Sequence, residues 1–141
     1  MGLLRLEHKL YASVFVDVDV EHHRVEYGCG FACDEHWHAP FDRLISGGVL
    51  NSPWGLALAP ANFGRFSNDL LVGNFGDGRI SAFNPVTGAF LGQLLNRNGA
   101  VLSIDGLWMI TFGNSTAPSN ALFFSAGIND EADGLFGKLQ P

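Results

Sequence analysis

An internal repeat in the C-terminal two-thirds of the chain constrains the fold more than any single motif does. The segment that begins SPWGLALAP aligns with the segment that begins SIDGLWMI, so that Gly55 corresponds to Gly106 and Gly78 to Gly134. The two copies cover about residues 51–95 and 103–141. Because each copy of such a repeat forms one structural unit, the sequence predicts two similar units in succession.

Each copy contains short apolar runs separated by turn residues such as Asn-Gly, Asp-Gly and Ser-Asn, which is typical of antiparallel strands. The expected strands are 55–59, 70–72, 79–83 and the run AFLGQLL in the first copy, and 107–112, 122–125 and 135–139 in the second. Four short antiparallel strands per repeat are the pattern of a β-propeller blade. We therefore expect an all-β fold of antiparallel four-stranded, blade-like repeats.

The length of the chain limits how many blades it can form. A closed propeller needs about four to eight blades of about 40 to 50 residues each, whereas this chain has 141 residues in total. Two blades leave edge strands and an apolar face that have to be covered. The sequence thus predicts a partial β-propeller of two blades or a compact two-sheet β fold, with self-association or a partner covering the open blade edges.

The composition changes near residue 43. All five histidines and both cysteines precede this point, and Gly, Asn, Phe and Leu dominate after it. We therefore divide the chain into an atypical N-terminal β segment, residues 1–42, and the two repeats, within residues 43–141. In the N-terminal segment, valines at every second position from Val14 to Val20 predict a half-buried strand.

The charge and the short apolar runs of the sequence argue against a nucleic acid partner and against a membrane helix. The formal net charge is -6, and the eight Lys and Arg residues are scattered, so no basic stripe could follow a nucleic acid backbone. No apolar run approaches the ~20 residues that a membrane helix needs. Charged residues at Arg5, Glu7 and Lys9 interrupt the N-terminus, so we expect no signal peptide there.

Three stretches support a resemblance to a known family: NSPWGLALAP, NDLLVGNFGDGRISAFNPVTGAFLGQL and AGINDEADGLFGKL. They resemble a bacterial family of exported proteins built on NHL-like propeller repeats, with an architecture related to the gluconolactonase and paraoxonase propellers. The resemblance runs from about residue 43 to the C-terminus and does not include residues 1–42. It implies blade-like repeats and an extracytoplasmic location, but no particular activity, because that family has none settled.

The resemblance to lactonase propellers also implies a site for a divalent cation. In such propellers, carboxylate and asparagine oxygens from several blades converge on a central ion, which polarises a lactone carbonyl and helps to activate water. The candidate calcium ligands here are Asn51, Asn74, Asp105, Asn129 and Asp130, with Asp105 as the catalytic base. The alternative is that these residues serve turns, as Asp-Gly pairs and Asn residues before strands commonly do.

A second candidate metal site lies in the stretch GCGFACDEHWHAP. Cys29, Cys33, His36 and His38 supply four donors of the kind that zinc prefers. The spacing requires one continuous loop to wrap around the ion, without the hairpin or helix that usually separates the two ligand pairs. One alternative is a His-rich site in which His36 and His38 lie on one face of a strand and join His22 or His23 of the neighbouring strand. The other is a set of surface histidines beside a small buried pair of cysteines.

Two functions follow from these observations. The preferred hypothesis is a metal-assisted hydrolase, dependent on calcium or zinc, that opens a lactone or ester ring with Asp105 as base. The alternative is a non-catalytic NHL-like binding or scaffold module that holds a peptide or a glycan. We expect no nucleotide cofactor, because the glycines of GNFGDGR lead into a strand and not into a helix. Trp54 and Trp108 are interpreted as blade-packing residues.

Overall fold

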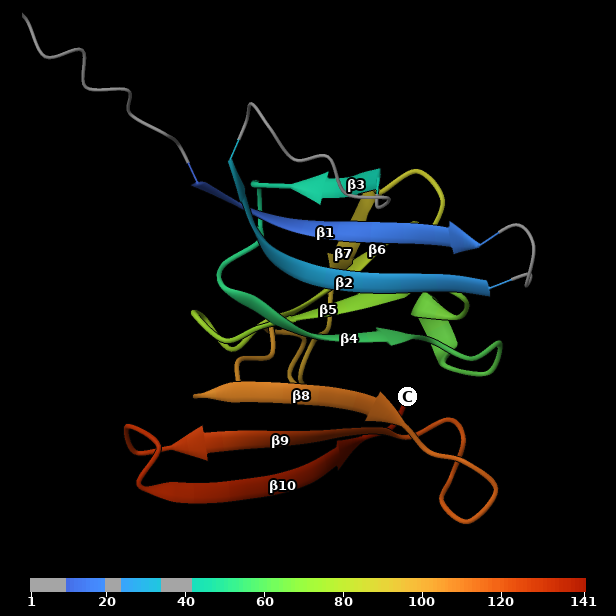
Figure 1. Cartoon of the computed structure of the whole chain (residues 1–141). Coiled ribbons are helices and arrows are strands. Elements are labelled where there is room, and N and C mark those ends of the chain that lie inside the picture. Colours follow the sequence, from blue (N-terminus) through green and yellow to red (C-terminus); the bar gives the residue numbers. More distant parts are fainter. Residues whose placement is uncertain (1–9, 20–23, 34–41) are drawn as a thin grey trace, which may run out of the picture.

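The computed structural model describes residues 10–19, 24–33 and 42–141, and it is built from antiparallel strands (Figure 1). The predicted all-β fold is confirmed. The strands are β1 (Leu10–Asp19), β2 (Arg24–Cys33), β3 (Asp42–Ser46), β4 (Pro53–Leu58), β5 (Leu70–Asn74), β6 (Ile80–Phe83), β7 (Phe90–Gln93), β8 (Leu107–Phe112), β9 (Leu122–Ile128) and β10 (Asp133–Leu139). A short 3-10 helix, η1 (Gly64–Phe66), connects β4 to β5. No helix in this described part of the chain is long and apolar enough to cross a membrane.

The strands form three antiparallel sheets. Their strand orders are β2-β1-β3, β4-β5-β6-β7 and β10-β9-β8. Figure 1 shows them as layers, with the four-stranded sheet between the two three-stranded ones. The first repeat therefore forms the expected four-stranded unit, and the second repeat forms a unit of three described strands.

The strand boundaries follow the sequence prediction closely. β8 has the predicted bounds, while β5 and β9 continue for two and three residues beyond the predicted ends at Val72 and Ser125. β3 pairs with β1 in one sheet and lies across the division that we drew at residue 42. That division into two parts stays a prediction.

The two central strands of the middle sheet, β5 and β6, are buried on both faces. All residues of β5 and β6 are buried, which explains their near-continuous apolar sequence. Leu71 and Ile80 belong to a core shared with β8 and β9. Leu70, Val72 and Phe83 belong to a second core, which includes Ile45 of β3. The alternation of side chains along β5 thus joins the middle sheet to both of its neighbours.

The strands β4 and β8 approach each other so closely that only glycine fits at position 55. A Cβ atom on Gly55 would lie 2.9 Å from the backbone nitrogen of Ile110 and 2.9 Å from the carbonyl oxygen of Trp108. Its counterpart in the repeat, Gly106, lies in the turn before β8 with φ +61°. A Cβ atom on Gly106 would overlap the carbonyl oxygen of Gly127, so both aligned glycines permit a close backbone contact, and Gly106 also has the positive φ of a turn.

Candidate functional site

The segment before β4, the β5–β6 turn and the segment before β8 lie beside one another. The backbone N–H of Gly76 donates to the carbonyl oxygen of Asn51 at 3.1 Å, and the N–H of Ile104 donates to the carbonyl oxygen of Gly78 at 2.9 Å. The side chain of Asn51 covers Gly76 so closely that a Cβ atom there would overlap it. The structure therefore brings Asn51 next to the β5–β6 turn, and the same turn lies next to the residue that precedes Asp105.

Asn74 differs from Asn51 and Asp105 in being fully buried, while the other two are exposed. Its Nδ2 donates to the carbonyl oxygen of Val49 at 2.9 Å. Its Oδ1 has no hydrogen-bond partner among the described residues. Because a buried polar atom without a partner costs free energy, the native state retains this amide at an energetic cost.

Asn129 and Asp130 lie in the tight β9–β10 turn. Asn129, Asp130 and Glu131 all have positive φ, at 55°, 53° and 64°, which is a conformation that Asn and Asp tolerate better than most residues. Asn129 Nδ2 donates to Asp133 Oδ2 at 2.7 Å. Similarly, Asp77 Oδ1 accepts from the backbone N–H of Arg79 at 3.1 Å. Asp77 and Asp133 thus make local turn contacts of the kind that the turn interpretation describes.

Neither predicted metal site is tested by the structure. Within the described residues, no three side chains of Asp, Glu, His or Cys lie together as a metal site. A calcium ion at the predicted site would therefore need asparagine side-chain oxygens among its ligands. The calcium site stays a prediction. For zinc, Cys29 and Cys33 belong to β2, whose backbone alone is described, and His36 and His38 lie outside the described residues. The zinc set also stays a prediction.

Aromatic side chains meet where β4 and β8 begin. The ring of Trp108 lies 4.7 Å from that of Trp54, edge to face, and 4.7 Å from that of Phe75. Trp108 is therefore a packing residue, as expected. Trp54 is 59% exposed, so it covers the edge of this cluster and is not part of the core.

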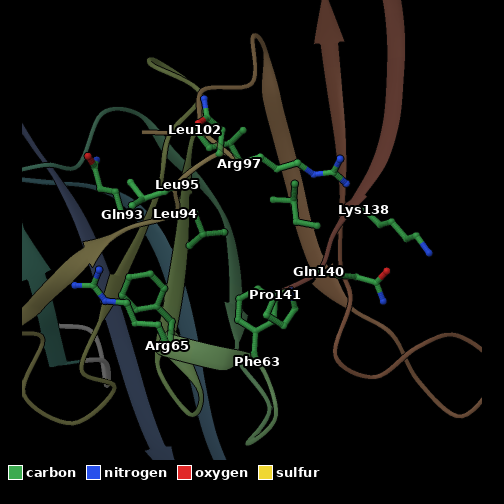
Figure 2. A pocket seen from close by; sticks show the side chains of 13 residues that line it. Phe63, Arg65, Gln93, Leu94, Leu95, Arg97, Leu102, Lys138, Gln140 and Pro141 are labelled. Carbon is green, nitrogen blue, oxygen red and sulfur yellow. The ribbon is translucent and has the colours of Figure 1, made fainter. Parts of the chain in front are cut away.

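A pocket of about 480 Å³ opens between the two repeats (Figure 2). It lies between η1, the end of β7 with the segment that follows, and the end of β10. The residues that line it are Phe63, Arg65, Phe66, Gln93, Leu94, Leu95, Asn96, Arg97, Leu102, Lys138, Leu139, Gln140 and Pro141. Sequence reasoning missed this site because its lining comes from segments that are far apart in the chain.

The lining of the pocket combines an apolar interior with a polar, cationic edge. Phe63, Phe66 and Leu94 are buried, whereas Arg65, Arg97 and Lys138 are exposed. The lining contains no Asp or Glu residue. The guanidinium carbon of Arg65 lies 5.1 Å from the centre of the Phe66 ring, a cation–π arrangement that orients the side chain.

Comparisons with known proteins identify relatives in a virus. The chain is 41% identical over 101 residues to "Uncharacterized protein R648" of Acanthamoeba polyphaga mimivirus. The aligned region covers 69% of this chain and 24% of that protein. It is also 41% identical to "Uncharacterized protein L690" of the same virus, again over 101 residues, covering 25% of that protein. The chain thus spans about a quarter of the length of these relatives.

The chain was also compared with models of protein families and with solved structures. No model of a known protein family matches the sequence. Among solved structures, the chain is similar to an aldose sugar dehydrogenase from Streptomyces coelicolor in its PQQ-bound form, with a TM-score of 0.45 and 26% identity, over 64% of this chain and 25% of that chain.

The predicted resemblance to a bacterial family of exported proteins is wrong, because the relatives found are mimivirus proteins. The physical reason lies in the stretches on which the resemblance was based. They consist of strand residues and hairpin turns such as Asp-Gly, which blade-like units require in general. Such motifs indicate the type of fold and not the family. The extracytoplasmic location that was inferred from the family therefore loses its support.

Proposed function

We propose that this chain is a non-catalytic binding module that takes a small molecule into the pocket between its two repeats. The pocket itself is the observation that carries the proposal. Its volume of about 480 Å³ lies within the range of roughly 300 to 1,000 Å³ that is usual for small-molecule sites. Buried Phe63, Phe66 and Leu94 give it an apolar interior, and the polar groups are confined to its edge.

The same lining offers little for hydrolysis. A hydrolase needs a general base or a metal-bound water close to the substrate. The pocket is lined by arginine, lysine, amide and apolar side chains, and none of these is an effective base while arginine and lysine remain charged. The binding module is therefore better supported than the lactone hydrolase, whose candidate residues lie at other places in the fold.

Binding of a neutral fluorescent probe tests this function. N-phenylnaphthylamine fluoresces strongly when it leaves water for an apolar site. We expect saturable binding of one probe per chain, because the pocket holds a single aromatic body of this size. Leu95 lines the pocket and is 50% exposed, so L95W would partly fill the pocket and weaken binding about tenfold.

The matched control is V86W, since Val86 is 83% exposed and is not part of the lining. This variant should bind the probe as the unchanged chain does. Thermal unfolding of both variants checks that they are folded. The absence of saturable binding to the folded chain would overturn the proposed function, and equal affinity of both variants would show that the probe binds elsewhere.

A further inference from the structure

Resting on the proposed function, we infer that the pocket selects small organic anions: molecules with an apolar body and one carboxylate group. The distribution of charge over the chain supports this inference. The chain as a whole carries a formal net charge of -6. Arg65, Arg97 and Lys138 nevertheless line one pocket, together with amide side chains and without any Asp or Glu residue. The charged side chains of the lining are therefore all positive and complementary to a negative ligand, although the chain as a whole is acidic.

These three cations have no acidic partner in the described structure. The described ion pair of the fold joins Arg79 to Asp77, at 4.0 Å, and lies outside the pocket. No carboxylate of the described residues forms an ion pair with Arg65, Arg97 or Lys138. Their charges therefore remain available to a ligand.

The three cations lie at the exposed edge of the pocket, beside its apolar interior. Figure 2 shows Arg65 on one side of the pocket and Arg97 extending on the other side toward Lys138. Because Arg65 is stacked on Phe66, its charge lies directly at the edge of the buried interior. A ligand whose ring contacts Phe63, Phe66 and Leu94 would place its charged end at the rim of the pocket, within reach of the cations on either side.

A carboxylate is the group that this edge would recognise best. Arginine binds a carboxylate through two parallel N–H donors, and lysine adds a point charge. We therefore assign Arg97 and Lys138 as the residues that hold the carboxylate, while Arg65 contributes to the field and to the shape of the pocket. The amides of Gln93, Asn96 and Gln140 can donate further hydrogen bonds to the bound oxygen atoms.

A pair of ligands that differ only in charge tests the inference. Naphthylacetate and naphthylacetamide have the same ring and nearly the same shape, and each can be titrated by displacement of N-phenylnaphthylamine at pH 7. A charge-assisted hydrogen bond contributes roughly 1.5 to 3 kcal/mol, which corresponds to about tenfold or more in affinity. We therefore expect the acid to bind about tenfold more tightly than the amide.

Variants of the cations then locate the interaction. R97Q and K138Q should each weaken the acid about fivefold or more and leave the affinity of the amide within about twofold. R79Q removes the same charge from a residue outside the pocket and should leave both affinities unchanged. Arg97 and Lys138 are both exposed, so these substitutions leave the core intact.

The possible results separate the two proposals. If neither ligand nor the probe binds, the proposed function fails. If acid and amide bind equally well and R97Q changes neither, the pocket binds small molecules but the inferred selectivity for anions is wrong. If R79Q weakens the acid as much as R97Q does, the preference arises from the overall field of the protein, and the assignment of Arg97 and Lys138 is overturned.

Discussion

Gly55 lies against the backbone of Ile110, where a Cβ atom would stand 2.9 Å from the nitrogen. This contact fixes the distance between β4 and β8, the strands through which the two repeats meet. An added methyl group would have to push two backbones apart, because neither neighbour is the end of a flexible side chain. Overpacking of this kind typically costs about 1 to 3 kcal/mol.

We therefore expect G55A to lower the free energy of unfolding by about 1 to 3 kcal/mol. Urea unfolding followed by circular dichroism measures this change. The matched control is G134A, since a Cβ atom on Gly134 would meet nothing within 4 Å, and its effect should stay within about 0.5 kcal/mol. Equal effects of the two substitutions would mean that the β4–β8 contact is looser than described.

Asn74 provides a second prediction, on the free energy of unfolding. In N74A the carbonyl oxygen of Val49 loses its donor, although the unpartnered Oδ1 is removed as well. We expect the loss of the hydrogen bond to Val49 to outweigh the removal of the unpartnered Oδ1. The free energy of unfolding should therefore fall by about 1 kcal/mol. The control is N98A, because Asn98 is exposed and no side-chain hydrogen bond of it is described. A stability of N74A above that of the unchanged chain would show that the orphaned oxygen outweighs the bond to Val49.

The binding-module proposal makes a prediction about catalysis. Because no Asp or Glu side chain lines the pocket and no three acidic, histidine or cysteine side chains gather among the described residues, we expect no turnover of a lactone panel in a pH-stat assay. Chelation and the addition of calcium or zinc should change nothing. Chelator-sensitive acid release that disappears in D105N would instead support the hydrolase hypothesis and contradict the proposed function.

The outer strand β10 is the subject of the last prediction. β10 lies at the edge of its sheet, and Phe136 is 70% exposed while stacked on Phe123 at 5.9 Å. Exposed apolar edge strands favour association between chains. We expect any concentration-dependent association in sedimentation experiments to decrease in F136K, because the charge opposes strand pairing, and to persist in the control V86K. Association that is the same in both variants would place the contact on another surface.

Much of the fold was predictable from the sequence because strands and turns are encoded locally. The apolar run LWMITF with turn residues before it defines β8 almost without context, and the apolar run at the start of β5 predicted a strand there. The aligned Gly78 and Gly134 show the limit of this reasoning. Gly78 has φ +67° in the β5–β6 turn, whereas Gly134 lies inside β10, so equal residues in a repeat did not mean equal backbone conformations.

The candidate site was much less predictable. The sequence drew attention to Asn and Asp residues, but the candidates Asn129 and Asp130 lie in the tight β9–β10 turn, for which the same residue types are required. The pocket depends on Arg65, Arg97 and Lys138, which are separated along the chain and brought together only by the packing of the two repeats. Single basic residues in a sequence carry no information about such an arrangement until the sheets are placed against each other.

The burial of β5 and β6 on both faces has a consequence for how the protein folds. Leu71 and Leu70 are neighbours in β5, yet they contribute to two separate cores. The four-stranded sheet therefore gains its full stability only after a second layer has docked on each side, and it cannot act as an autonomous folding unit. β5 and β6 contribute to both cores, so the two cores should unfold together. The amide hydrogens of these two strands should be among the last to exchange with solvent.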